Sequence, residues 1–314
     1  MKLLIPPMGA QALNQVREAA PAVEIVIAEN HNDALNKIVD VDAAYTFATP
    51  ELIRAGKKLR WVQVGSAGVE SYLSPELVES DIILTNAKGV YAIHIAEHVM
   101  ALILSFARAI NLLIHRQIDE IWESRANLPV IEINGLTLGI VGLGGIGLEV
   151  AKSAHALGMR ILAADPTQTY QPDYVEHLWR LDKLHDMLRE SDFVAICCPL
   201  TPQTRNMMSV EEFKCMKPTA YLINIARGGI VDQEALIKAL ETKEIAGAGL
   251  DVTVPEPLPK GNPLWQMENV IITPHMAGQS PVSSRRLMKI FTENLKRFVN
   301  GEPLLNVVDK KLGY

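Results

Sequence analysis

Arg227, Glu256 and His275 are the residues whose types and positions best suit chemistry, because each follows an apolar run that predicts a β-strand. The carboxyl ends of neighbouring strands in an open α/β sheet face one ligand crevice, so we expect the three side chains to converge. Histidine titrates near neutrality and can exchange a proton with a reacting oxygen, while a carboxylate beside it orients the ring. A planar guanidinium can bind a carboxylate through two parallel hydrogen bonds. Together the three groups favour proton transfer on a 2-oxo or 2-hydroxy acid.

Each of these residues alone also has a purely structural explanation. Arg227 could be a surface ion-pair partner, Glu256 a solvated loop acid between two prolines, and His275 a hydrogen-bonded loop histidine. Lone polar residues in loops usually have such roles. Their shared position at three predicted strand ends is what favours the catalytic interpretation.

A glycine-rich turn between a predicted strand and a predicted helix indicates a dinucleotide site. Residues 138–141 form an apolar run, and Gly142, Gly144 and Gly147 follow it with the spacing G-x-G-x-x-G. The first glycine permits the tight turn, the second lets a pyrophosphate approach the backbone, and the third lets the helix pack closely on the strand. The N–H groups at the start of that helix would bind the phosphates. The predicted phosphate-binding residues are Gly142, Gly144, Gly145, Ile146 and Gly147.

An acidic residue at the end of the next strand indicates which dinucleotide binds. The run 160–164 is followed by Asp165, which lies 18 residues after Gly147. This is close to the separation of about 20 residues at which an acid accepts hydrogen bonds from the adenosine ribose. A carboxylate there would repel the 2′-phosphate of NADP, so the sequence favours NAD. NAD carries hydride, so we expect the proton transfer described above to accompany hydride transfer.

Length and composition set the broad class. The chain has 314 residues, 48% of them apolar, which suits two cores rather than one. A formal net charge of −6 without a dense Lys/Arg run argues against nucleic acid or an anionic membrane as a partner. Cys197, Cys198 and Cys215 form no C-x-x-C pair, which suits a reducing compartment. The apolar N-terminal run is short and ends at Pro6 and Pro7, unlike a secretory signal, so we expect a cytoplasmic protein.

Short apolar runs alternate with helical patterns in both halves of the chain. This alternation predicts an α/β fold with two Rossmann-like or flavodoxin-like domains, each built on a parallel sheet, and a ligand cleft between them. The last amphipathic helix, at residues 283–299, is expected to return to the first domain. We assign residues 1–88 plus 283–314 to a substrate-binding, catalytic domain and residues 89–282 to an NAD-binding Rossmann domain. Strands are expected at residues 2–5, 25–28, 42–47, 61–64, 82–85, 138–141, 161–164, 193–197, 220–225, 246–252 and 270–273.

A helix that is apolar almost all round is predicted at residues 91–108, although its charged residues leave no run long enough to cross a membrane. It contains His94, Glu97 and His98 in the pattern H-x-x-E-H, which places two imidazoles on one helix face and occurs in some zinc metalloproteases. No comparable signal marks the rest of a zinc site, so we expect no metal. The simpler interpretation is a buried helix whose Glu97 and histidines form hydrogen bonds at the domain junction.

Residues 111–133 lack the alternation of strands and helices found on either side of them. They mix helix-forming residues with charge. They are predicted either to form an arm that packs on another subunit or to be a solvated helical loop, and the residues alone favour neither.

These motifs, together with several others, resemble those of the NAD-dependent D-isomer-specific 2-hydroxyacid dehydrogenases, including glyoxylate and hydroxypyruvate reductases. The resemblance covers most of the chain. It implies hydride transfer between NAD and a small 2-oxo or D-2-hydroxy acid such as glyoxylate or hydroxypyruvate. It also implies a homodimer formed through the cofactor domains, which the arm at residues 111–133 would suit. The matching segments are residues 65–70, 96–98, 139–147, 199–202, 224–232, 251–257, 273–278 and 300–304.

The resemblance also implies roles for individual residues. Arg227, Glu256 and His275 would be the catalytic arginine, glutamate and histidine of the family. Asp251 would bond the nicotinamide carboxamide, and Ala226 would lie where the backbone meets that ring. The loop that would clamp the substrate carboxylate through backbone N–H groups consists of Gly65, Ser66, Ala67 and Gly68. The further cofactor-binding residues are Pro199, Thr204, Ala226, Asp251 and Gly278.

A second class of function shares the same fold and motifs. The C-terminal-binding corepressors resemble these dehydrogenases but act mainly through NAD-dependent assembly. No peptide-binding feature is evident in this sequence. Turnover of NADH with a 2-oxo acid would discriminate between an enzyme and such a scaffold.

Overall fold

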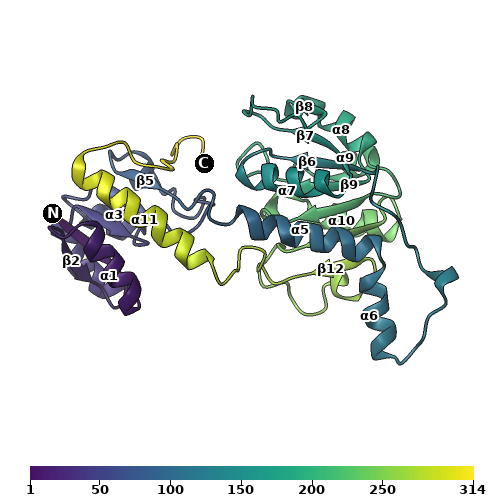
Figure 1. Cartoon of the computed structure of the whole chain (residues 1–314), viewed down its shortest axis with the longest axis horizontal. Helices are drawn as coiled ribbons and strands as arrows, with labels where there is room; N and C mark the ends of the chain where they lie inside the picture. Colours follow the sequence, from purple (N-terminus) through teal and green to yellow (C-terminus); the bar gives the residue numbers. More distant parts are fainter. The chain divides into compact units, whose positions relative to one another are not determined.

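The computed structural model describes residues 1–314, except for the side chain of Arg125. The chain divides into two compact units. Unit 1 consists of Met1–Tyr91 and Ser280–Tyr314, and unit 2 consists of Ala92–Gln279. Each unit contains one sheet whose strands all pair in parallel, which confirms the expected α/β class with two parallel-sheet domains (Figure 1).

The crossings between the units differ slightly from residues 88 and 283, where the sequence placed them. Unit 1 extends to Tyr91, whose hydroxyl donates to the carbonyl oxygen of Gly65 in the same unit. The Asn306 side chain also donates to the Lys88 carbonyl at 2.9 Å. Such side-chain contacts tie the end of this segment to unit 1, and a pattern of strands and helices cannot reveal them.

Unit 1 has a five-stranded sheet in the order β2-β1-β3-β4-β5. Its strands are β1 (Lys2–Ile5), β2 (Glu24–Ile27), β3 (Ala43–Tyr45), β4 (Trp61–Gln63) and β5 (Ile83–Thr85). Its helices are α1 (Ala10–Ala19), α2 (His31–Lys37), α3 (Pro50–Ala55), α4 (Pro75–Val78) and α11 (Ser283–Asn300). Proline at the first turn of α3 and α4, after a threonine or serine cap, sets where these two short helices begin.

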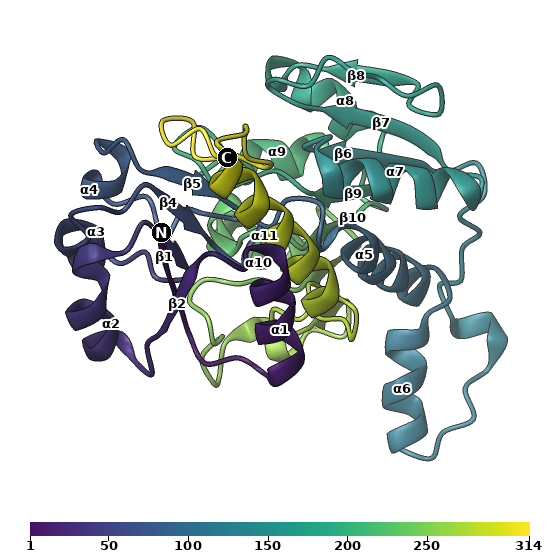
Figure 2. The ribbon, with the colours of Figure 1, turned by 60° about the vertical axis from the view of Figure 1, so that its left-hand side comes forward.

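Alternate strand residues of the unit 1 sheet point to opposite sides, and helices bury the residues on each side. Leu4 and Val62 pack with residues of α2, α3 and α4, whereas Leu3 and Trp61 pack with residues of α1 and α11. Figures 1 and 2 show α1 and α11 side by side. Phe291 of α11 is fully buried, and its ring centroid lies 6.0 Å from that of Trp61. The last helix therefore completes the core of the first unit.

Unit 2 has a seven-stranded sheet in the order β12-β11-β10-β9-β6-β7-β8. Its strands are β6 (Thr137–Val141), β7 (Arg160–Ala164), β8 (His177–Trp179), β9 (Phe193–Ile196), β10 (Tyr221–Asn224), β11 (Gly247–Leu250) and β12 (Val270–Ile272). Its helices are α5 (Ala92–Ala107), α6 (Ile110–Ile118), α7 (Gly145–Ala156), α8 (Leu184–Glu190), α9 (Val210–Cys215) and α10 (Gln233–Glu241).

The sequence did not predict the strand β8 at residues 177–179. β8 has three residues, none of them buried, and it pairs only with β7 at the edge of the sheet. A strand so short and exposed has no apolar run to reveal it. Its pairing depends on the neighbouring strand.

The point where the strand order reverses lies between β6 and β9 of unit 2. Chain connections leave these two adjacent parallel strands in opposite directions along the sheet, and ligands of open α/β sheets bind at the carboxyl ends of such strands. One face of the sheet packs on α8, α9 and α10, where Val141 and Val194 belong to the buried cluster. On the other face α5 packs beside α7, and Phe106 of α5 stacks on Tyr221 with ring centroids 4.8 Å apart.

The segment that lacks strand and helix alternation contains α6 and a short 3-10 turn at Arg125–Asn127. Figures 1 and 2 show α6 leading away from the sheet of unit 2, and none of its residues is buried. No single helix in the described part of the chain is long and apolar enough to cross a membrane. α5 and α6 reach that length only as a pair bent by 68°, and most of α5 is buried.

Candidate active site

The segments that follow β10, β11 and β12 lie against one another at the carboxyl edge of the unit 2 sheet. These strands are neighbours and run in parallel, so their ends meet at one edge. A Cβ atom on Gly228 would overlap the carbonyl oxygen of Thr253, so the first two segments touch through their backbones. The second and third are joined by the hydrogen bond from the His275 N–H to the Asp251 carbonyl, at 2.8 Å.

His275 and Glu256 form a direct pair. His275 Nδ1 lies 2.7 Å from Glu256 Oε2, and the two side chains are 48% and 37% exposed. The Thr253 N–H donates to the other carboxylate oxygen, Oε1, at 3.2 Å. The carboxylate accepts hydrogen bonds only, so Nδ1 carries the proton in this pair and Nε2 is the ring atom left to meet a ligand. An acid and an imidazole from different strand ends are thus brought together as the sequence predicted.

The backbone at His275 is in an unusual conformation. Its φ angle is 51°, in the left-handed region that only a small share of residues other than glycine occupy, with histidine, asparagine and aspartate the most frequent among them. Such a conformation costs roughly 1–3 kcal/mol and persists only where neighbouring contacts hold it. It lies at the residue assigned to chemistry, which is where strained backbone often occurs.

Asp251 supplies many of the contacts that hold the segment around His275. Its side chain is buried, and Oδ1 accepts from the Thr273 hydroxyl at 2.6 Å and from the Met276 N–H at 2.9 Å. Oδ2 accepts from the Ala277 N–H at 2.9 Å. A carboxylate has about four acceptor positions, so one remains on Oδ2. The bond from Asp251 to a nicotinamide carboxamide stays a prediction, and what the structure shows is that Asp251 shapes the loop.

Arg227 lies in a tight turn after β10. Asn224 closes this turn, because its side chain accepts from the Ala226 N–H at 3.1 Å and donates to the Arg227 carbonyl at 3.0 Å. The guanidinium Nη1 donates to the Ala226 carbonyl at 2.7 Å. Asn224 is buried, and sequence reasoning did not assign it a role.

The loop at residues 65–68 of unit 1 is arranged like an anion site. All four of its carbonyl oxygens accept a hydrogen bond. The donors are the Tyr91 hydroxyl for Gly65, the Ala87 N–H for Ser66 (2.9 Å), the Asn86 amide for Ala67 (2.7 Å) and the Ser66 hydroxyl for Gly68 (2.6 Å). Within the part of the chain that the structure describes, none of the four N–H groups donates a hydrogen bond. Successive backbone N–H groups can bind an anion where they converge on one point.

Tyr45, which is buried, and Tyr91, which is half-buried, lie beside this loop. Burial raises the pKa of Tyr45 to about 12 and also raises the pKa of Tyr91. Both phenols therefore stay protonated at neutral pH. The proton on Tyr91 is the one that its hydroxyl donates to the Gly65 carbonyl, so burial helps to keep the loop in this arrangement.

The glycine-rich turn after β6 fits a dinucleotide. Gly142 has a φ of 96°, and a Cβ there would lie 2.6 Å from the backbone nitrogen of Cys198. A Cβ on Gly147 would overlap the carbonyl oxygen of Gly142, so the third glycine allows α7 to pack on the turn. Gly144, in contrast, has no atom within 4 Å of where its Cβ would be. The space there is open beside the start of α7, where the first N–H groups of Gly145, Ile146 and Gly147 have no acceptor within the helix.

Asp165 lies at the end of β7 next to this turn. Its carboxylate accepts from the backbone N–H groups of Leu143 at 2.8 Å, Thr167 at 2.8 Å and Gln168 at 2.7 Å, and the residue is 8% exposed. The acid therefore also ties the glycine-rich turn to the loop after β7.

The segment after β9 contributes Pro199 and Thr204, which were expected to contact the cofactor. The Thr204 hydroxyl donates to the Pro199 carbonyl at 2.7 Å and so closes this loop at the reversal point of the sheet. Burial raises the pKa of the Cys197 and Cys198 thiols, that of Cys198 to about 12. Both thiols stay protonated, so they are not nucleophiles near neutral pH.

Both histidines of the H-x-x-E-H pattern bond to the segment of unit 2 that follows β12. His94 Nε2 lies 2.8 Å from the Gly278 carbonyl oxygen, and His98 Nε2 lies 3.0 Å from Thr273 Oγ1. Glu97 is exposed. Among the side chains that the structure describes, no group of three His, Cys, Asp or Glu residues is placed to hold a metal.

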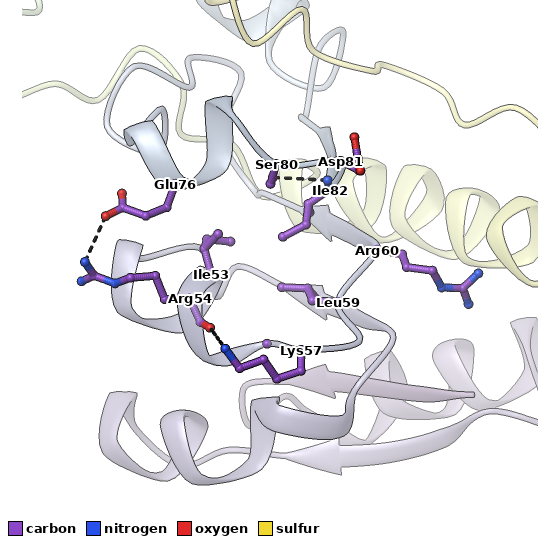
Figure 3. A pocket seen from close by; sticks show the side chains of 10 residues that line it. Ile53, Arg54, Lys57, Leu59, Arg60, Glu76, Ser80, Asp81 and Ile82 are labelled. Carbon is purple, nitrogen blue, oxygen red and sulfur yellow. Dashed lines mark hydrogen bonds and ion pairs between the residues drawn. The ribbon is translucent and has the colours of Figure 1, made fainter.

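A concavity of about 370 Å³ on unit 1 is lined by none of these residues (Figure 3). Several of its charged side chains form ion pairs or hydrogen bonds with neighbouring residues. Arg54 pairs with Glu76 at 3.1 Å, and Lys57 donates to the Arg54 carbonyl at 3.1 Å. It contains no acid and imidazole pair and no glycine-rich turn, so we do not assign the chemistry to it.

Comparisons with known proteins agree with this geometry. The family described as "D-isomer specific 2-hydroxyacid dehydrogenase, NAD binding domain" matches residues 100–277. The chain is 36% identical over 305 residues to a glyoxylate reductase of Korarchaeum cryptofilum, covering 94% of this chain and 88% of that protein. It is 34% identical over 314 residues to a D-3-phosphoglycerate dehydrogenase of Methanocaldococcus jannaschii, covering 98% of this chain but only 59% of that protein.

A solved structure is also similar over the whole chain. This is a D-isomer specific 2-hydroxyacid dehydrogenase of Xanthobacter autotrophicus Py2, determined in complex with NADPH and MES. The TM-score is 0.86 at 29% sequence identity, and 99% of each chain is covered.

We predict that Gly144→Val weakens NADH binding by at least about tenfold, equivalent to about 1.4 kcal/mol. The valine side chain would fill the open space beside the start of α7, where the fold itself needs no glycine. Binding is measured by NADH fluorescence titration, and folding by the melting temperature.

Gly9→Val is the matched control, because Gly9 is also the N-cap of a helix and also has open space at its Cβ position. It should leave NADH affinity unchanged. Wild-type affinity in Gly144→Val would show that the pyrophosphate does not approach this turn.

Proposed function

The chain belongs to the D-isomer specific 2-hydroxyacid dehydrogenases, and we propose that it transfers hydride reversibly between NAD(H) and a small 2-oxo or D-2-hydroxy acid such as glyoxylate or hydroxypyruvate. The observation that carries this proposal is the His275–Glu256 pair, at 2.7 Å, on the carboxyl edge of a dinucleotide-binding sheet. The name of the glyoxylate reductase to which the chain is similar supports the substrate class.

His275 acts as the general acid in reduction and the general base in oxidation. The bound nicotinamide supplies or accepts the hydride. Hydride arriving at a carbonyl carbon leaves negative charge on the oxygen, which then takes a proton from His275. Because Nδ1 faces Glu256, the proton leaves from Nε2. Glu256 fixes the ring and stabilises the imidazolium.

Arg227 and the loop 65–68 bind the acid group of the substrate. The planar guanidinium contacts the carboxylate and polarises the carbonyl oxygen. In unit 1, the N–H groups of Gly65, Ser66, Ala67 and Gly68 offer donors for a carboxylate, since all four carbonyls of this loop accept hydrogen bonds from other groups. The guanidinium and the backbone N–H groups contact the substrate carboxylate directly, so binding needs no positively charged surface around them.

NAD(H) is bound along the edge of the unit 2 sheet. Gly142, Gly144, Gly145, Ile146 and Gly147 hold the pyrophosphate, and Asp165 accepts from the adenosine ribose. Asp251 offers its remaining acceptor position to the nicotinamide carboxamide. Pro199, Thr204, Ala226 and Gly278 complete the cofactor site. Asp165 gives the protein a preference for NADH, even though a similar protein of Xanthobacter autotrophicus binds NADPH.

We propose that the protein is a cytoplasmic homodimer in which α6 and the residues after it pack on a second copy. Ile110, Ile114 and Ile118 lie at fourth-residue spacing along one face of α6 and are 42%, 52% and 73% exposed. Trp122, in the segment that follows, is 100% exposed. Apolar surface of this kind is typical of an interface. The three free cysteines support a reducing compartment.

Turnover tests the proposed function directly. NADH oxidation is followed with a panel of 2-oxo acids that includes glyoxylate and hydroxypyruvate. Steady turnover supports the proposal, and NADH binding without turnover of any member would favour a scaffold of the corepressor type, which the comparisons do not support.

We predict that His275→Gln lowers kcat in both directions by roughly 10²–10⁴, the usual loss for a general acid and base. Glu256→Gln keeps the size and one acceptor oxygen but removes the charge, so it should lower kcat less than His275→Gln does. Full activity of His275→Gln would move the proton transfer to another group.

We predict that kcat/KM with NADH exceeds that with NADPH by at least about tenfold, because placing a phosphate against an acid costs more than about 1.4 kcal/mol. Asp165→Ala should narrow this ratio. Asp165 also ties two loops together, so its replacement could lower the efficiency with both cofactors. The ratio of kcat/KM with NADH to kcat/KM with NADPH is measured because such a general loss leaves it unchanged.

Asp173→Ala is the control, since it removes an exposed carboxylate from the loop between β7 and β8. It should leave the cofactor ratio unchanged. Equal efficiency of wild type with NADH and NADPH contradicts the assignment of Asp165.

We predict that Ile114→Asp combined with Ile118→Asp converts a dimer to a monomer in sedimentation velocity. The two charges would have to be buried without a partner. Val210→Asp, at a similarly exposed apolar residue of α9, should leave the dimer intact. A monomeric wild-type protein would remove the role given to α6.

A further inference from the structure

His94 and His98 of α5 lie one helical turn apart and bond to both ends of the loop that carries His275. His94 Nε2 is 2.8 Å from the carbonyl oxygen of Gly278, and His98 Nε2 is 3.0 Å from the hydroxyl oxygen of Thr273. His94 is buried, and the His98 side chain is 18% exposed. Their spacing places both rings on the same helix face.

The partners of the two rings fix where their protons lie. A carbonyl oxygen only accepts, so His94 donates from Nε2 to Gly278. The Thr273 hydroxyl gives its own proton to Asp251 Oδ1 at 2.6 Å, so it must accept from Nε2 of His98. Each histidine is thus a donor to the loop, and His98 is the start of a chain that ends at the Asp251 carboxylate.

The loop needs such support because its backbone is strained between these two points. Thr273 and Gly278 flank His275, whose φ of 51° is in the left-handed region. Asp251 holds the middle of the loop through the N–H groups of Met276 and Ala277. The two histidines hold its ends from a helix that is itself packed on the sheet.

We propose that His94 and His98 are positioning residues, which hold the loop 273–278 so that His275 keeps its orientation toward Glu256 and the substrate. This inference rests on the proposed function of His275. It explains the H-x-x-E-H pattern without a metal, since the two Nε2 atoms that a metal would need are directed at different acceptors in the loop. It also explains why two polar rings lie on a helix that is otherwise largely apolar.

The experiment compares two replacements at each histidine. His98→Leu and His94→Leu remove the donor, whereas His98→Gln and His94→Gln keep an amide donor at a length close to that of Nε2. We expect each leucine variant to lower kcat for 2-oxo acid reduction by about 10- to 100-fold, as a misplaced catalytic group does. NADH affinity should stay at the wild-type value, and the glutamine variants should recover most of kcat.

A slower chemical step should also increase the kinetic isotope effect with NADH deuterated at the transferred position. Hydrogen exchange provides a readout that needs no turnover. The Met276 and Ala277 amides should exchange faster in the leucine variants than in the glutamine variants. His155→Leu, at an exposed histidine of α7, is the matched control and should change neither quantity.

The outcomes separate this inference from the proposed function. Equal kcat and equal amide exchange in the leucine and glutamine variants would overturn the positioning role, because packing alone would then explain the histidines. If wild-type protein turns over no 2-oxo acid, the proposed function fails, while amide exchange at Met276 and Ala277 still decides whether the histidines hold the loop. Loss of NADH affinity together with kcat would overturn the inference in favour of a general disruption of unit 2.

Discussion

The carboxylate of Asp251 is the contact on which the edge of the unit 2 sheet depends. It is buried at the end of β11, and the three groups that donate to it all come from the segment after β12. A buried charge is tolerated only when hydrogen bonds satisfy it, and here the donors that do so are one hydroxyl and two backbone N–H groups. The same contacts decide the path of the chain at His275. The hydrogen bonds that satisfy the Asp251 carboxylate therefore also orient the His275 side chain.

The molecule also shows how a chain with a formal net charge of −6 can be suited to anionic ligands. At residues 65–68 every carbonyl is turned to an internal donor, and at the start of α7 the helix geometry leaves N–H groups without acceptors. Both arrangements place partial positive charge where it is needed without a basic surface. A sequence-wide charge balance says nothing about such local groups.

The fold could be predicted largely from the sequence because apolar runs are its main determinant. β9 is apolar throughout and β1 is apolar after Lys2, both are buried on both faces there, and each was assigned within one residue of its observed ends. β8 was missed because an exposed edge strand depends on its neighbour rather than on its own residues. The meeting of Glu256 and His275 could likewise be predicted, since parallel topology brings the segments after β11 and β12 to one edge of the sheet.

What could not be predicted were contacts between segments that are distant in sequence. His94 and Gly278 are separated by 184 positions, so a local pattern can mark the histidine but cannot name its partner. For the same reason the pattern could not identify the acceptors of the two rings, which include a carbonyl and a hydroxyl of unit 2. The roles of Asn224 and Asn86 were missed because each side chain bonds to the backbone of a loop, and the residue type alone does not reveal such a contact.

The return of α11 to unit 1 has a consequence for the order in which the protein can fold during synthesis. Leu3, Tyr45 and Trp61 lie in the same buried cluster as Phe291 and Leu295, which the ribosome adds only after all of unit 2 has been made. Until then only α1 covers this face of the first sheet, whereas the segment that forms unit 2 is continuous and can close its own core. β1 is the first strand to be translated, yet it belongs to the core that is completed last. Its apolar residues therefore stay without part of their native contacts during most of translation, when they could form non-native contacts.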